Sequence, residues 1–221
     1  LPVKYYDRES VYRDTIPFFN FYRPTVSAEA PEAYLIPQGW WKVIELLELN
    51  GVTMQRLQKD TLITVEYSLI RDYQSQTTPY EGHHANSNIQ TEIRSGQVSF
   101  RQGDFLIPMN QERRRFLVEV LEPRGNDSYF AWNDFDAILV QKEGYSDYAY
   151  EDLAAEYLEE HPDLKAELML KRQSDLNFAA SPSAQLDFVF KHSPYYEEGH
   201  NRYPVYRLLP QDKQKLYREQ E

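Results

Sequence analysis

The strongest constraint on the fold is a change of pattern near residue 140. The middle of the chain holds short runs rich in β-branched and aromatic residues, which favour strands. The last third carries helix-start signals instead. The sequence therefore predicts an α+β fold, with an antiparallel β-sandwich or barrel-like sheet followed by a C-terminal helical segment.

The β part is predicted to start after one short helix. Apolar residues between Val43 and Leu49 fit that helix, and Asn50-Gly51 is a typical stop. Within the run 89–100, Ser95-Gly96 is a hairpin-type signal. The apolar residues of 129–140 fit neither the helical nor the strand periodicity clearly. The predicted strands are 53–57, 61–70, 89–100 with its break, 103–108 and 115–123.

Three signals predict helices in the last third. Ser146 is a candidate N-cap for a helix whose apolar face includes Tyr150 and Ala154. Pro162 suits a first helical turn, and Ser181 followed by Pro182 repeats the device. The polar tail 213–221 is expected to fray.

The first 39 residues are rich in proline and aromatic residues. Prolines at 17, 24, 31 and 37 forbid a long helix and favour extended chain. The aromatics could dock on a neighbouring surface, or the segment could cover its own domain. We therefore expect three parts. These are a connector arm (1–39), a β-rich domain with one short helix (40–140), and a helical segment packed on that domain (141–221).

Composition narrows the function. The formal net charge is −11, and a chain this acidic without a large basic cluster is a poor partner for nucleic acid. No run approaches 18 apolar residues, so membrane insertion is not expected. The absence of cysteine removes thiol nucleophiles and Cys-based zinc sites. No signal peptide is visible and the chain begins at Leu1, which indicates a processed protein or a fragment.

The stretch PYEGHHANSN (79–88) is the best candidate for chemistry. Pro79, Gly82 and the Asn/Ser residues favour turns, so we expect a polar connection between strands near 61–73 and 89–100. If the chain is extended there, adjacent His83 and His84 point in different directions. We assign no catalytic and no metal-binding residue. The candidate ligand or interface contacts are Tyr80, Glu81, His83, His84, Trp40 and Trp41.

Two other functions stay open. Glu81, His83, His84 and Glu92 before GDFLIP (103–108) look similar to a cupin pattern, but the later histidine is missing and the site would be degenerate. With 18 Tyr, 11 Phe and 3 Trp, the chain could also be a sandwich that binds carbohydrate or peptide.

Longer phrases resemble the C-terminal region of large bacterial secreted zinc carboxypeptidases, relatives of the carboxypeptidase A-like metallopeptidases. The resemblance implies a zinc peptidase domain upstream of Leu1, as both partner and site of the cofactor. It also implies an extracytoplasmic location, periplasmic or secreted. The family's H-x-x-E zinc motif has no match here, so this chain is expected to be a non-catalytic accessory domain without a cofactor of its own. The phrases are YLIPQGWWKVIELLELNGV (34–52), PYEGHH (79–84), GDFLIPMNQERRRFLVEVLEP (103–123), WNDFDAILVQKEGYSDYAYED (132–152) and AQLDFVFKHSPYYEEGHNRYPVYRL (184–208).

Overall fold

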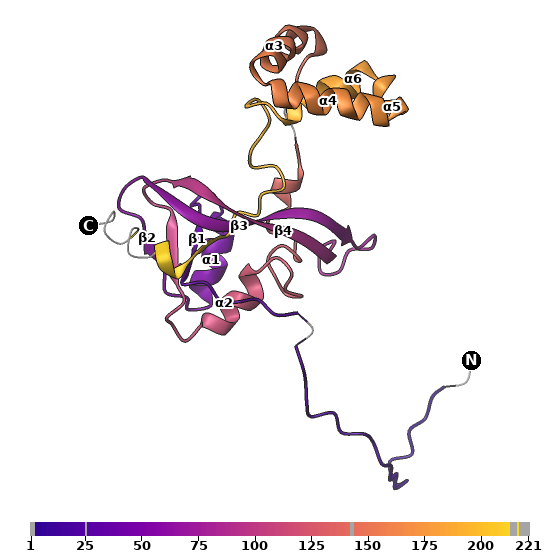
Figure 1. Cartoon of the computed structure of the whole chain (residues 1–221). Helices are drawn as coiled ribbons and strands as arrows, with labels where there is room; N and C mark the ends of the chain where they lie inside the picture. Colours follow the sequence, from indigo (N-terminus) through magenta and orange to yellow (C-terminus); the bar gives the residue numbers. More distant parts are fainter. Residues whose placement is uncertain (1–2, 25, 142–143, 213–215, 217–221) are drawn as a thin grey trace.

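One antiparallel sheet organises the chain in the computed structural model, which describes residues 3–24, 26–141, 144–212 and 216 (Figure 1). The strands in these residues are β1 (Ala33–Ile36), β2 (Gln55–Arg56), β3 (Thr61–Ser75), β4 (Asn86–Phe100), β5 (Phe105–Pro108) and β6 (Tyr206–Leu208). Their order is β2-β5-β1-β6-β3-β4, and the end strands β2 and β4 do not pair with each other. The predicted α+β class is confirmed.

β3 and β4 form one long hairpin. The predicted break at Ser95-Gly96 is wrong, because Gly96 lies inside β4 opposite Val65. The pairing with β3 continues across this glycine and outweighs its local preference for a turn. The chain turns instead between residues 76 and 85, so the stretch with the two histidines connects the two strands, as predicted.

The helices α1 (Trp41–Leu49) and α2 (Arg114–Leu121) supply the core on one face of the sheet. α1 was predicted, and it ends at Asn50 before Gly51, which has φ +72°. The strand predicted over 115–123 is wrong, because this segment is mostly α2. Its buried residues Leu117, Val120 and Leu121 recur at helical spacing. A short apolar run of this length can be read as either a helix or a strand, and this ambiguity explains the wrong prediction.

The opposite face of the sheet carries a second core. Leu35, Ile63, Val65 and Leu208 are fully buried there. The prediction placed residues 141–221 in a helical segment, but β6 returns to the sheet between β1 and β3. The short run Tyr206–Leu208 alternates buried and half-buried residues and fills this gap.

Four helices that lie between β5 and β6 along the sequence form a separate cluster, which we call the helical module. They are α3 (Asp147–Glu160), α4 (Pro162–Ser174), α5 (Leu176–Ala179) and α6 (Pro182–Lys191). Their principal contacts are with one another, around a core that includes Tyr150, Phe178 and Phe190. In Figure 1 the module stands away from the sheet, which differs from the packing on the β domain that we expected.

The helix-start signals have mixed outcomes. Pro162 and Pro182 occupy first-turn positions, and the Ser181 hydroxyl accepts a hydrogen bond from the Ala184 N–H at 3.3 Å. These predictions are confirmed. Ser146 precedes α3 but makes no side-chain cap hydrogen bond. Most of the tail predicted to fray lies outside the described residues.

Residues 3–24, which we call the arm, contain no helix or strand and are exposed throughout. The arm leaves the domain as an extended chain (Figure 1). The predicted connector boundary at residue 39 is too late, because β1 already pairs with β5 and β6 from Ala33 onward. The apolar run AYLI is buried along its whole length, which an exposed connector could not provide. Between α2 and α3 the structure also has a 3₁₀ helix, η1 (Asp136–Leu139).

Candidate functional site

The tip of the β3–β4 hairpin ends in a tight turn. The backbone N–H groups of Tyr80 and His83 each donate to the other residue's carbonyl, both at 2.9 Å. The two central residues, Glu81 and Gly82, have φ of +51° and +85°, as a type I′ turn requires. The turn presents Tyr80 and His83 side by side at one end of the molecule.

The side chains of this turn meet a loop from another part of the chain. The Trp132 ring lies 5.6 Å from the His83 ring, edge to face, and 6.4 Å from the Tyr80 ring. Tyr80 is 60% exposed, so the cluster has an open aromatic face. Such a face can stack on a planar or apolar part of a ligand or partner.

Amide side chains fasten this loop to the hairpin. Asn86, buried at the base of the tip, donates from Nδ2 to the Phe130 carbonyl at 3.0 Å and to Asp136 Oδ1 at 3.1 Å. Asn133 donates to Asp136 Oδ2 and to the His84 carbonyl, both at 3.0 Å. The relative positions of His83 and Trp132 are therefore fixed by hydrogen bonds and not only by packing.

Two carboxyl groups stand beside His83 in this loop. Burial raises the pKa of Asp134 above its usual range, while His83 and Lys42 act in the opposite direction. Burial also raises the pKa of Asp136, against the hydrogen bonds from Asn86 and Asn133. The site thus combines an aromatic face with two half-buried acids, an arrangement suited to ligand contact and hydrogen bonding.

The six predicted contact residues divide into three groups. Tyr80 and His83 come together with Trp132. His84 points elsewhere and donates from Nδ1 to the Gln76 carbonyl at 2.7 Å, so the adjacent histidines do have different partners. Glu81 is exposed at the turn.

The two predicted tryptophans also separate. The Trp40 ring packs on Phe135 beneath the loop, with ring centroids 4.9 Å apart. Trp41 is 61% exposed on α1. Sequence reasoning missed Trp132, Asp134 and Asp136, although the polar run WND inside an aromatic stretch is a loop signal.

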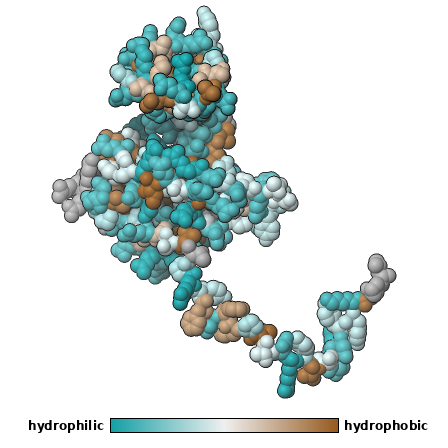
Figure 2. Space-filling view, turned by 45° about the vertical axis from the view of Figure 1, so that its right-hand side comes forward, coloured by the Kyte–Doolittle hydropathy of each residue, from teal (hydrophilic) through white to brown (hydrophobic). Residues whose placement is uncertain are grey.

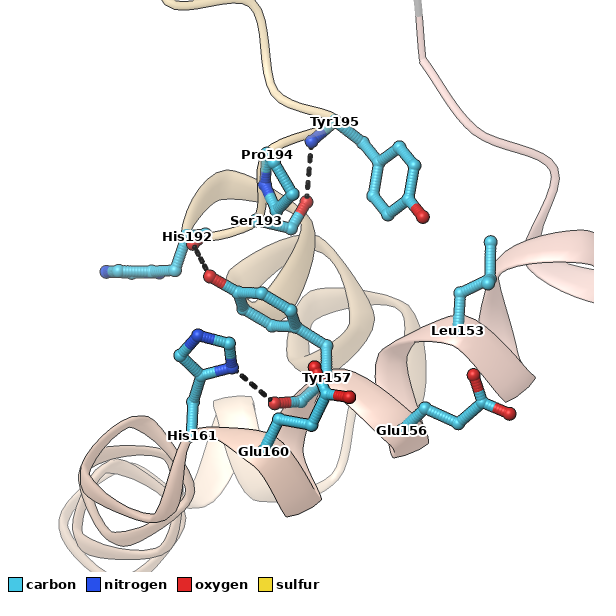
Figure 3. A pocket seen from close by; sticks show the side chains of 9 residues that line it. All are labelled: Leu153, Glu156, Tyr157, Glu160, His161, His192, Ser193, Pro194 and Tyr195. Carbon is cyan, nitrogen blue, oxygen red and sulfur yellow. Dashed lines mark hydrogen bonds between the residues drawn. The ribbon is translucent and has the colours of Figure 1, made fainter.

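A second candidate site is a hollow of about 660 Å³ on the helical module (Figure 3). The Tyr157 hydroxyl donates to the His192 carbonyl at 2.8 Å. His161 Nδ1 lies 2.8 Å from the Tyr157 carbonyl, and their rings are 3.9 Å apart. Glu156 and Glu160 line the same hollow. His192 Nδ1 lies 2.7 Å from the Phe188 carbonyl, so both histidines of this hollow contact backbone carbonyls of the module itself.

Over the part of the chain that the structure describes, no three His, Asp or Glu side chains are grouped so that they could hold a metal ion. The cupin-like alternative needs histidines that face one enclosed space, whereas His83 and His84 lie on a hairpin tip with separate partners. No described helix is long and apolar enough to cross a membrane.

Comparison with known proteins gives a weak and partial likeness. The chain is 26% identical over 106 residues to "Carboxypeptidase 2" of Trichophyton rubrum, which covers 48% of this chain and 20% of that protein. It is 27% identical over 99 residues to "Carboxypeptidase 2" of Trichophyton tonsurans, with 45% and 18% covered. "Probable carboxypeptidase 2" of Arthroderma benhamiae is 28% identical over 97 residues, with 44% and 18% covered.

The chain therefore matches about a fifth of the length of these curated relatives. No protein-family model and no solved structure matches it. The comparisons loosely support a carboxypeptidase-related region. The matching proteins are fungal, so they do not support the bacterial origin implied by the sequence resemblance.

Proposed function

We propose that this chain is a non-catalytic accessory region of a zinc carboxypeptidase, which docks on the peptidase domain and supports it. The observation that carries the proposal is the likeness to proteins named carboxypeptidase 2, limited to about a fifth of their length. The peptidase domain would hold the zinc ion, and the protein would act outside the cytoplasm. A zinc peptidase needs protein ligands and a metal-activated water, and the described residues do not assemble such a ligand group.

The hairpin tip is the surface that we assign to contact with the peptidase domain or its peptide substrate. Exposed Tyr80 beside Trp132 offers the aromatic anchor typical of a contact surface. Asn86 and Asn133 hold it in one conformation, which lowers the entropy lost on binding.

Two measurements test the accessory role. Residues 1–221 alone, purified without chelator, should release no C-terminal residue from a blocked dipeptide. In the Trichophyton rubrum relative, deletion of the matching fifth should leave peptidase activity but lower the midpoint of thermal inactivation. Chelator-sensitive activity of residues 1–221 would refute the non-catalytic role. An unchanged midpoint in the shortened relative would refute the supporting role.

A further inference from the structure

The outer edge of β4 is an open template for another strand. Ten consecutive residues, Thr91–Phe100, pair in regular register with Thr61–Ile70 of β3. β4 is the last strand in the sheet order, and no other described strand pairs with its outer side. Backbone N–H and C=O groups along such an edge are available to a further chain.

Two common protections of an edge strand are missing here, because Thr91–Phe100 contains neither proline nor lysine. Its two charges, Glu92 and Arg94, are paired with each other at 2.7 Å. Ile93 is 57% exposed on this strand. The edge is therefore long and regular and carries no net charge within Thr91–Phe100, which are the properties of a strand that accepts a partner.

The arm has the complementary properties. It is an extended chain whose large apolar side chains are exposed to solvent, at an unfavourable cost of hydration. Figure 2 shows brown and tan side chains along the arm, away from the folded body. These side chains are Val3, Tyr5, Tyr6, Val11, Tyr12, Ile16, Phe18, Phe19, Phe21 and Tyr22, and their exposed fractions lie between 69% and 92%.

One stretch of the arm suits strand addition. Ser10–Ile16 contains no proline, and Val11, Tyr12, Thr15 and Ile16 have high β propensity. Its charges, Arg13 and Asp14, cancel, as do those of the β4 edge. The two segments therefore bring no net charge of their own into the contact.

We propose that two copies of this chain exchange arms, with Ser10–Ile16 of each copy pairing as an added strand on the Thr91–Phe100 edge of the other. The root of the arm lies near the first residues of that segment, because Tyr22 and Arg23 line the same hollow of about 860 Å³ as Thr91 and Ile93. Each arm therefore starts close to the strand on which the partner's arm would pair, and the two pairings can form in one closed two-fold interface.

The course of the arm explains why the acceptor is a second copy and not the chain's own edge. Pro17 directly follows the added strand and Pro24 directly follows the root, and each favours an extended course. Figure 1 shows the arm running away from its own sheet. An exchanged arm that adds a strand forms main-chain hydrogen bonds between the two copies and uses only segments that each chain already exposes.

The test uses the full chain in solution. Light scattering at increasing concentration should show the mass approach twice the monomer value of 26.3 kDa. The chain has no cysteine, so single-cysteine variants Val11→Cys and Gln97→Cys can be mixed cleanly. A bis-maleimide linker should then join the two variants into a heterodimer.

Two sets of variants locate the contact. Val11→Pro with Thr15→Pro removes two backbone donors from the arm without touching the folded sheet, and should abolish the dimer. Ile93→Lys with Gln97→Lys should do the same by protecting the edge. The matched control is Leu176→Lys, at an 83% exposed apolar residue on α5, which should leave the dimer intact.

Three outcomes would overturn the exchange. The first is a monomer at every concentration with unprotected arm amides in hydrogen exchange. The second is a monomer whose arm amides are protected, which would mean pairing within one chain. The third is a dimer that survives both the arm and the edge variants, which would place the interface elsewhere.

Discussion

At the residue scale, the two acids beside His83 should respond differently to the same substitution. Burial raises the pKa of both carboxyls, so the folded state binds their protons more tightly than the unfolded state. Their contribution to stability therefore falls as pH rises from about 3.9, the unfolded value, through the folded pKa. Asp134→Asn removes a charge that burial disfavours. The free energy of unfolding of the Asp134→Asn variant, relative to that of the parent chain, should therefore increase as the pH is raised from 4 to 7.

Asp136→Asn is the matched comparison, because Asp136 accepts hydrogen bonds from two amide donors. An asparagine would turn one N–H₂ group toward Asn86 or Asn133 and leave a donor without its acceptor. We expect a loss of about 1–3 kcal/mol at neutral pH. Urea denaturation of both variants across this pH range checks the pair. Equal losses for the two would contradict the assigned environments.

The residues of this site could be predicted only in part, because the site joins two distant segments. The turn chemistry of Glu81-Gly82 is local, so the connection and its position followed from the sequence. Trp132 lies 49 positions from His83 in the numbering. Their contact depends on Asn86 and Asn133 bridging two loops, and no spacing rule encodes such a bridge.

At the element scale, two serines in equivalent positions allow a controlled test of helix capping. Ser181 precedes α6 and accepts from the Ala184 N–H, whereas Ser146 precedes α3 without such a bond. Ser181→Ala should lower the free energy of unfolding of the helical module by about 1 kcal/mol. Ser146→Ala should change it by only a few tenths. Denaturation followed by helical circular dichroism measures both, and equal effects would show that the cap bond is not the cause.

Elements with a clear local signal were predictable, whereas two predictions that depend on tertiary packing were wrong. Pro162, Pro182 and Ser181 mark helix starts by backbone chemistry alone. The run 115–123 has no such mark, and its buried residues Leu117, Val120 and Leu121 fit a helix only once their packing is known. Gly96 shows the reverse case, because pairing with β3 keeps a turn-forming residue inside a strand.

At the scale of the whole molecule, the chain contains two packing units. The helical module is one continuous stretch of sequence, whereas the sheet is built from residues on both sides of it. The helical module enters after η1 and leaves before β6, so the sheet is completed by residues that follow the module. Within the module, Leu186 is half-buried at the edge of the core, whereas Phe188, Val189 and Phe190 fill that core.

This arrangement predicts that the module can unfold without the sheet. Its core shares no residue with the two cores of the sheet, and its helices mainly contact one another. Phe190 is 4% exposed in the module, so Phe190→Ala should cost the module about 3–5 kcal/mol. Leu47 is fully buried under the sheet, so Leu47→Ala should cost the sheet about 2–5 kcal/mol.

Hydrogen exchange resolved by segment distinguishes the two units. Phe190→Ala should speed exchange in α3, α4 and α6 while amides of β1 and β5 keep their protection. Leu47→Ala should speed exchange in β1 and β5, and the module should keep its protection because its core does not depend on theirs. If either variant accelerates both sets equally, the chain unfolds as one cooperative unit, and the separate cores do not correspond to separate folding units.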